Sequence, residues 1–180
     1  ELAIRLWTHE RVTWSGRFRA PLVEATVEPR PVQSPPPVWI GGGFSPESVE
    51  LAARLGCRLM LPTVFGTWSM FRPAVERYCE LWEQYGHDPA ERRIGACSHF
   101  LVGRDSEEVR ARWEPRYMAY TAKVQDWQEQ SAHQAGRKRI EMPFVDFGTM
   151  IRTIAICGSP SEVIDRMGEA REQLHLDTQI

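Results

Sequence analysis

The segment from residue 38 to residue 56 constrains the fold more than any other part of the chain. It begins with a short continuous apolar run, Val38-Trp39-Ile40, which three glycines end. Continuous apolarity, rather than alternation, is typical of a strand that is buried on both faces of a parallel sheet. A helix is expected next, because Ser45 suits an N-cap, Pro46 suits the first helical position and Gly56 suits a C-terminal stop. The segment therefore predicts a strand–turn–helix unit of an α/β protein.

The same alternation continues along the chain. Further strands are predicted at 59–61, 93–102 and 177–180, and helices at 46–55, 72–85, from 105 onward and from 159 onward. Pro115 is expected to kink or divide the helix that begins near Asp105. Alternating strands and helices imply a parallel sheet with right-handed crossovers. The chain is therefore predicted to be α/β throughout its C-terminal three quarters.

Two other segments do not fit this alternation. A turn at Ser15-Gly16 within an alternating stretch predicts a small hairpin or an ordered loop. Residues 28–37 hold five of the 13 prolines, which favours an extended, irregular lead-in to the first strand. Residues 125–139 are polar, and residues 142–150 mix apolar residues with Pro143 and Gly148. We therefore interpret 125–150 as an insertion or a mobile loop.

Composition excludes several classes of protein. The 180 residues carry a net charge of −2, whereas proteins that grip nucleic acid usually carry a strong positive excess. No apolar run approaches the roughly 20 residues of a membrane span, and no charged-then-apolar leader is present. The four cysteines show no C-x-x-C spacing, which favours reduced thiols. We therefore expect a cytoplasmic protein that binds neither nucleic acid nor membranes.

The strongest chemical signal is the glycine-rich corner from Gly41 to Ser48. Glycines let a ligand approach the backbone, and the free amides at a helix start favour an anion such as phosphate. Ser45 and Ser48 place hydroxyls on the first helical turn, although Glu47 disfavours a phosphate unless it points outward. An ordinary tight turn with a serine cap and no ligand has equal weight on this local pattern alone. The corner is neither a G-x-G-x-x-G fingerprint nor a Walker loop.

Other reactive residues give weaker signals. The five histidines show no i, i+4 pair, so no metal site is predicted, and the absence of a G-x-S-x-G elbow gives a hydrolase no support. His99 is interpreted as a strand residue that either points into a pocket or belongs to the core. Trp68 is expected in a loop, either lining a pocket or packing over the edge of the core, and Trp113 is expected in the core or an interface.

Several motifs, taken in order, resemble the bacterial luciferase-like flavin monooxygenase family. They are Trp14–Phe18, the proline-rich segment 29–37, Val38–Gly42, Ala52–Gly56 and Cys157–Val163. The resemblance implies a partial (β/α)8 TIM barrel, with strands that resemble the fifth to the start of the eighth. Residues 1–180 would then be the C-terminal portion of one barrel domain, without its first four strands. Such a piece leaves open sheet edges, so we expect it to be inactive alone and to aggregate or self-associate as a homo-oligomer.

The same resemblance implies a function and a set of contacts. It implies a monooxygenase that uses reduced FMN and oxygen on a small organic substrate, with a flavin reductase as a candidate partner. The alternatives are a deazaflavin-dependent hydride-transfer oxidoreductase and a degenerate chain that binds flavin without catalysis. The residues that match the family's phosphate-binding loop, together with a less direct contact at the end of the next strand, are Gly42, Gly43, Phe44, Ser45, Ser48 and Thr63. No catalytic residue is assigned.

Overall fold

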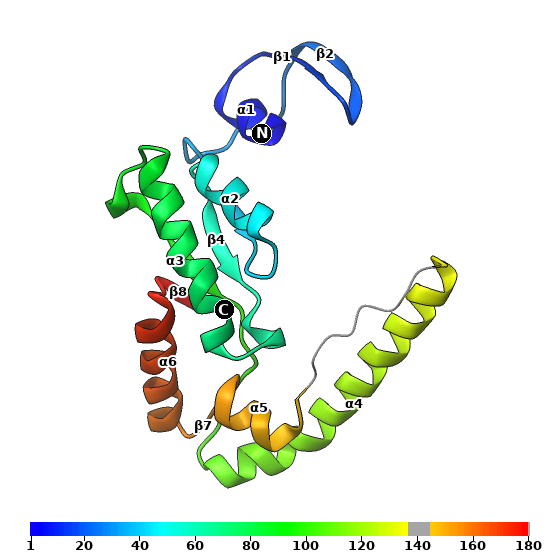
Figure 1. Ribbon diagram of the computed structural model, residues 1–180, viewed down its shortest axis with the longest axis vertical. Helices are drawn as coiled ribbons and strands as arrows, with labels where there is room; N and C mark the ends of the chain where they lie inside the picture. Colours follow the sequence, from blue (N-terminus) through cyan, green and yellow to red (C-terminus); the bar gives the residue numbers. More distant parts are fainter. Residues whose placement is uncertain (137–144, 180) are drawn as a thin grey trace.

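The computed structural model describes residues 1–136 and 145–179. A small N-terminal unit lies at one end of the molecule (Figure 1) and consists of α1 (Leu2–Thr8), β1 (Val12–Gly16) and β2 (Arg19–Ala25). β1 and β2 are antiparallel, so the hairpin is confirmed, but its turn lies at residues 17–18, because Ser15 and Gly16 belong to β1. The following residues, 26–38, contain no helix or strand, as their prolines predicted. Arg30 in this segment donates to the Leu6 and His9 carbonyls at 2.9 and 3.0 Å, which ties the lead-in to the end of α1.

The central sheet has four parallel strands. They are β3 (Trp39–Gly41), β4 (Arg58–Leu61), β5 (Ile94–Ala96) and β8 (Thr178–Gln179), in the order β3-β4-β5-β8. A separate parallel pair is formed by β6 (Phe100–Val102) and β7 (Ile156–Gly158). The predicted parallel α/β organisation is confirmed, and within the described residues neither sheet closes on itself.

Two strand predictions were wrong in detail. Residues 93–102 do not form one strand, because the chain leaves the central sheet after Ala96 and re-enters a different pairing at Phe100. The break contains Ser98, a buried polar residue whose hydroxyl lies 2.6 Å from that of Thr63. β3 is not buried on both faces either: Trp39 and Ile40 are half-buried and Gly41 is exposed, because β3 pairs with β4 alone at the edge of the described sheet.

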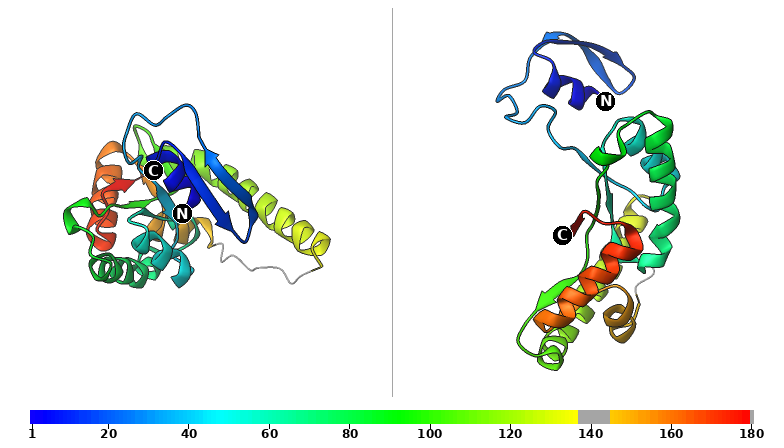
Figure 2. Two further views of the ribbon diagram at one scale, coloured as in Figure 1. Left: turned by 90° about the horizontal axis from the view of Figure 1, so that it is seen from above. Right: turned by 90° about the vertical axis from the view of Figure 1, so that its left-hand side faces the viewer.

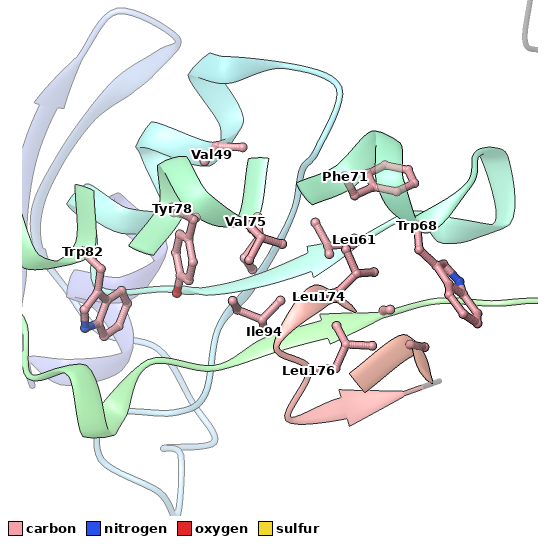
Figure 3. Packing of buried hydrophobic residues seen from close by; sticks show 14 of the residues in the cluster. Val49, Leu61, Trp68, Phe71, Val75, Tyr78, Trp82, Ile94, Leu174 and Leu176 are labelled. Atoms are coloured by element: carbon pink, nitrogen blue, oxygen red, sulfur yellow. The ribbon is translucent and has the colours of Figure 1, made fainter. Parts of the chain in front are cut away.

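Three helices share the main core with the central sheet. They are α2 (Pro46–Arg54), α3 (Trp68–Gln84) and α6 (Pro160–Leu174). α3 begins four residues before the predicted start and includes Pro73, because buried Trp68 and Phe71 extend its apolar face. Figure 3 shows the side chains of this core, among them Val49, Leu61, Phe71, Val75, Tyr78, Ile94 and Leu174. Short 3-10 turns, η1 (Thr63–Phe65) and η2 (Pro89–Glu91), follow β4 and precede β5.

The longest element, α4 (Ser106–Gln134), runs through Pro115 without interruption. A division at Pro115 was wrong, since one proline removes a single N–H while the flanking turns keep theirs, and a kink there stays a prediction. The outer half of α4 extends away from the rest of the chain (Figures 1 and 2). Residues 125–134 are therefore helical, as are the last residues of the 125–150 segment in α5 (Phe147–Thr153), whereas 137–144 lie outside the described residues. That 125–150 is an insertion stays a prediction.

A second, smaller core joins α4 and α5 to the β6–β7 pair. Its buried members are Val109, Tyr117, Phe147, Met150, Ile154, Ala155 and Cys157. Glu162 at the start of α6 accepts hydrogen bonds from Ser106, at 2.6 Å, and from Arg110 of α4. This core therefore fixes the position of α4 against the strands. None of the helices in the described ranges is long and apolar enough to cross a membrane.

Candidate functional site

The glycine-rich corner lies where β3 ends and α2 begins. The Gly42 amide donates to the Met60 carbonyl at 3.0 Å, which extends the β3–β4 ladder by one bond. Gly43 has a φ of +140°, and a Cβ added there would lie 2.8 Å from Cδ1 of Phe71. L side chains rarely adopt this backbone conformation, so glycine is required at position 43 on two grounds. A Cβ at Gly41, in contrast, would meet nothing within 4 Å.

The start of α2 has the predicted cap. Ser45 has an extended backbone, its hydroxyl oxygen accepts from the Ser48 amide at 3.3 Å, and Pro46 follows it at the first helical position. The Ser45 hydroxyl also donates to the Glu47 carboxylate at 2.6 Å, and this hydrogen bond holds the pKa of Glu47 below its ordinary value. The carboxylate therefore lies against the serine that a phosphate would contact, and an incoming phosphate must displace it.

Five of the six predicted contact residues come together in this corner. Phe44 is 57% exposed and packs edge-on against Phe71, with ring centroids 5.1 Å apart. Ser48 is half-buried, and its Cβ packs 3.3 Å from the place where a Gly42 Cβ would lie. These five residues are Gly42, Gly43, Phe44, Ser45 and Ser48. They lie at the start of a helix of nine residues, where the dipole favours an anion, and that they contact a cofactor phosphate stays a prediction.

Thr63 lies at the same edge of the sheet but faces a different direction. It is fully buried, and its hydroxyl donates to the Cys97 carbonyl at 2.9 Å and lies 2.6 Å from Ser98 Oγ. Its side chain therefore joins the end of β4 to the segment after β5. A contact between Thr63 and a cofactor stays a prediction, since no part of the residue is exposed in this arrangement.

A hollow of about 630 Å³ lies between the strand ends and α4. Its lining residues are Val64, His99, Leu101, Arg112, Trp113, Arg116, Tyr117 and Tyr120. Of these, the sequence indicated His99 as a pocket or core residue and Trp113 as a core or interface residue. His99 lines the hollow, and it lies between β5 and β6 rather than in the predicted strand. The missed signal was the i, i+4, i+7 spacing of Trp113, Tyr117 and Tyr120, which places three aromatic rings on one face of a helix.

Burial lowers the pKa of the His99 imidazole, and a backbone hydrogen bond with Val64 opposes the shift only in part. Because the pKa of His99 is lower in the folded state, the unfolded chain binds more protons at acidic pH. The contribution of the neutral imidazole to the free energy of unfolding is therefore fully present above the unfolded-state pKa, and it is lost as the pH falls through the folded-state pKa. We expect the free energy of unfolding to fall from pH 7 toward pH 5, and less so in His99→Gln. Denaturant titrations across this range, with an NMR titration of the His99 ring, measure this. A His99 pKa above that of a free histidine would contradict it.

Other predicted features have ordinary roles. The expected loop position of Trp68 was wrong, because Trp68 begins α3. It is only 4% exposed, with the Arg166 guanidinium 4.3 Å from its ring centre, so its packing on the core is confirmed. Trp113 packs against the second core and also lines the hollow. No group of three potential metal ligands occurs among residues 1–136 and 145–179.

The sequence of the chain matches the model of one protein family. The model of the luciferase-like monooxygenase family matches residues 1–178. The chain belongs to this family. No curated protein sequence matches the chain at a significant level.

Solved structures of similar fold agree with this membership. The monooxygenase RslO1 from Streptomyces bottropensis is 23% identical, with a TM-score of 0.70 over 97% of this chain and 49% of that one. The oxygenating constituent of 3,6-diketocamphane monooxygenase from Pseudomonas putida, in complex with FMN, is 17% identical, with a TM-score of 0.63 over 99% and 53%. The coenzyme F420 dependent tetrahydromethanopterin reductase from Methanopyrus kandleri is 19% identical, with a TM-score of 0.66 over 98% and 53%.

The chain therefore spans about half the length of these structures. Its described sheets are open, and they match half of the TIM-barrel fold of the family. The family contains both FMN monooxygenases and F420-dependent enzymes.

Proposed function

We propose that the protein carrying this chain is a flavin-dependent monooxygenase that uses reduced FMN and oxygen on a small organic substrate. The observation that carries this proposal is the glycine-rich corner, which joins a parallel strand to a capped helix in a member of the luciferase-like family. We place β3, β4, β5 and β8 as the fifth to eighth strands of the barrel. The corner then lies at the carboxyl ends of the strands, where barrel active sites occur.

The residues of the corner would hold the cofactor by its phosphate. The positive end of the α2 dipole attracts an anion, which contributes roughly 0.3–1 kcal/mol at an exposed site. Pro46 has no N–H, and the Ser48 amide donates to the Ser45 hydroxyl, so a phosphate would have to replace that hydrogen bond. Gly43, with a φ of +140°, lets the chain turn from β3 toward α2, and the half-buried Ser48 offers a hydroxyl donor on the first turn of α2. The exposed Phe44 ring can cover the remainder of the ligand against water. Bound reduced flavin would supply the two electrons with which oxygen is split between the oxygenated substrate and water.

A deazaflavin is the second candidate cofactor. It is favoured by the similarity to a reductase that is described as coenzyme F420 dependent. Both cofactors carry a phosphate for the corner, so parallel titrations of the full-length protein with FMN and with F420 distinguish them. Uptake of F420 alone would replace the monooxygenase proposal with hydride transfer.

The two serines of the corner provide the direct test. We expect Ser45→Ala with Ser48→Ala to weaken FMN uptake by at least about tenfold, since hydrogen bonds to a charged group contribute roughly 1.5–3 kcal/mol each. The measurement is a fluorescence titration of FMN with the full-length protein.

A matched control is available at the start of α6. There Ser159 is the N-cap and Ser161 follows it, so Ser159→Ala with Ser161→Ala removes an equivalent cap at a helix with no assigned ligand. This control should leave FMN uptake unchanged. Equal losses in both double variants would mean that the serines act on stability rather than on the cofactor.

A further inference from the structure

Five of the eight side chains that line the 630 Å³ hollow come from α4. Trp113, Tyr117 and Tyr120 surround the His99 ring edge-on, with ring centroids 6.0, 5.6 and 6.1 Å from it. Tyr117 is fixed, because it is 4% exposed and its hydroxyl donates to the Val145 carbonyl at 3.1 Å. Tyr120 is 42% exposed, so its ring remains accessible from the opening.

His99 supplies a polar group among these rings. Its hydrogen bond with the Val64 backbone engages one ring nitrogen, and burial lowers its pKa, so the imidazole is neutral near pH 7. A neutral imidazole with one nitrogen engaged as a donor keeps the other as an acceptor. The hollow therefore combines flat aromatic walls with a hydrogen-bond acceptor.

Two arginines of α4 lie beside these aromatic residues in the sequence. Arg112 and Arg116 line the hollow, and Arg116 donates to the Arg112 carbonyl at 3.3 Å. Within residues 1–136 and 145–179, neither guanidinium forms an ion pair with a carboxylate. Guanidinium groups bind carboxylates in a planar, two-point geometry, so two unpaired arginines beside aromatic rings favour an anionic ligand with a flat ring.

We propose that this hollow binds an aromatic organic acid, with its ring against Trp113, Tyr120 and His99 and its carboxylate on Arg112 and Arg116. The inference rests on the proposed function, because it assigns the class of substrate that the flavin enzyme oxidises. Val64 follows Thr63 directly after β4, so the hollow opens at the same strand ends as the glycine-rich corner. Its volume suits a ligand of two or three rings.

The probe for this site is 2-naphthoate, titrated calorimetrically into the full-length protein in the absence of flavin. Two comparison ligands isolate the features of the proposal: 2-naphthalenemethanol keeps the rings without the charge, and cyclohexanecarboxylate keeps the charge without the flat ring. We expect 2-naphthoate to bind at least about tenfold more tightly than either. Its ring current should also shift the NMR signals of His99.

The decisive variant is Arg112→Gln with Arg116→Gln. Both arginines are exposed, so folding is retained, and we expect at least a tenfold loss of 2-naphthoate affinity with unchanged FMN uptake. Arg54→Gln with Arg171→Gln is the control of equal charge on exposed positions of α2 and α6, and it should bind 2-naphthoate as the parent does. Absence of 2-naphthoate binding, equal binding of the neutral alcohol, or equal losses in both arginine pairs would overturn the proposal. Failure of FMN uptake with intact 2-naphthoate binding would instead remove the proposed function.

Discussion

Replacing Gly43 by alanine is expected to destabilise the protein by about 1–3 kcal/mol and to abolish tight FMN uptake. The backbone at this position has a φ of +140°, and holding a residue with a Cβ in such a sparsely populated region costs roughly this amount. The added Cβ would also lie 2.8 Å from Cδ1 of Phe71, so either the α2 start or the Phe71 ring must shift. Either shift displaces the start of α2, where the phosphate is proposed to bind. Denaturant unfolding and FMN titration of the full-length protein measure the two effects.

Gly41→Ala is the control for this substitution. A Cβ at Gly41 would meet nothing within 4 Å, and the φ of Gly41 is not in the left-handed range. We expect a change in the free energy of unfolding within about 0.5 kcal/mol, as for most surface substitutions. If Gly43→Ala were as mild as Gly41→Ala, the requirement for glycine at the corner would be refuted.

Local signals in the sequence identified the strand–corner–helix unit. The apolar run at residues 38–40, the Ser45 cap and Pro46 each act within a few residues, so their positions agree with the structure. The hydrogen bond from Ser45 to Glu47 could not be predicted in the same way, because it depends on a side-chain rotamer. Nor could the direction of the Thr63 hydroxyl, which is set by the partner Cys97, 34 residues away.

The hollow on α4 could not be predicted from single segments of the sequence. Its lining requires α4 to continue past Pro115 and requires the chain to leave the central sheet between Ala96 and Phe100. A proline usually interrupts a helix, and a mostly apolar run usually predicts one strand. Tertiary contacts of Tyr117 stabilise the continuous helix, and those of Ser98 stabilise the break between the strands. The aromatic spacing on α4 was present in the sequence, but its meaning depends on His99, which packs against it from a distant segment.

Phe71→Ala should be the most destabilising of these substitutions, with a loss of about 3–5 kcal/mol. The ring is fully buried in the main core and contacts both the Gly43 backbone and the Phe44 ring, so its removal leaves a cavity directly beneath the corner. Phe18→Ala, at a residue that is 93% exposed, makes the same chemical change without a cavity and should have little effect. Denaturant unfolding of both variants in the full-length protein provides the comparison, and similar losses would contradict the assigned packing.

The two large effects should also be coupled. In Phe71→Ala the atom that a Cβ at position 43 would strike is gone, so Gly43→Ala retains its backbone strain but loses its steric clash. A double-mutant cycle should therefore show that the combined loss of stability is smaller than the sum of the single losses, by roughly 0.5–3 kcal/mol as for residues in contact. Strict additivity would mean that Phe71 does not restrict position 43. The corner would then depend on backbone conformation alone, and FMN uptake would no longer be expected to depend on the Phe71 ring.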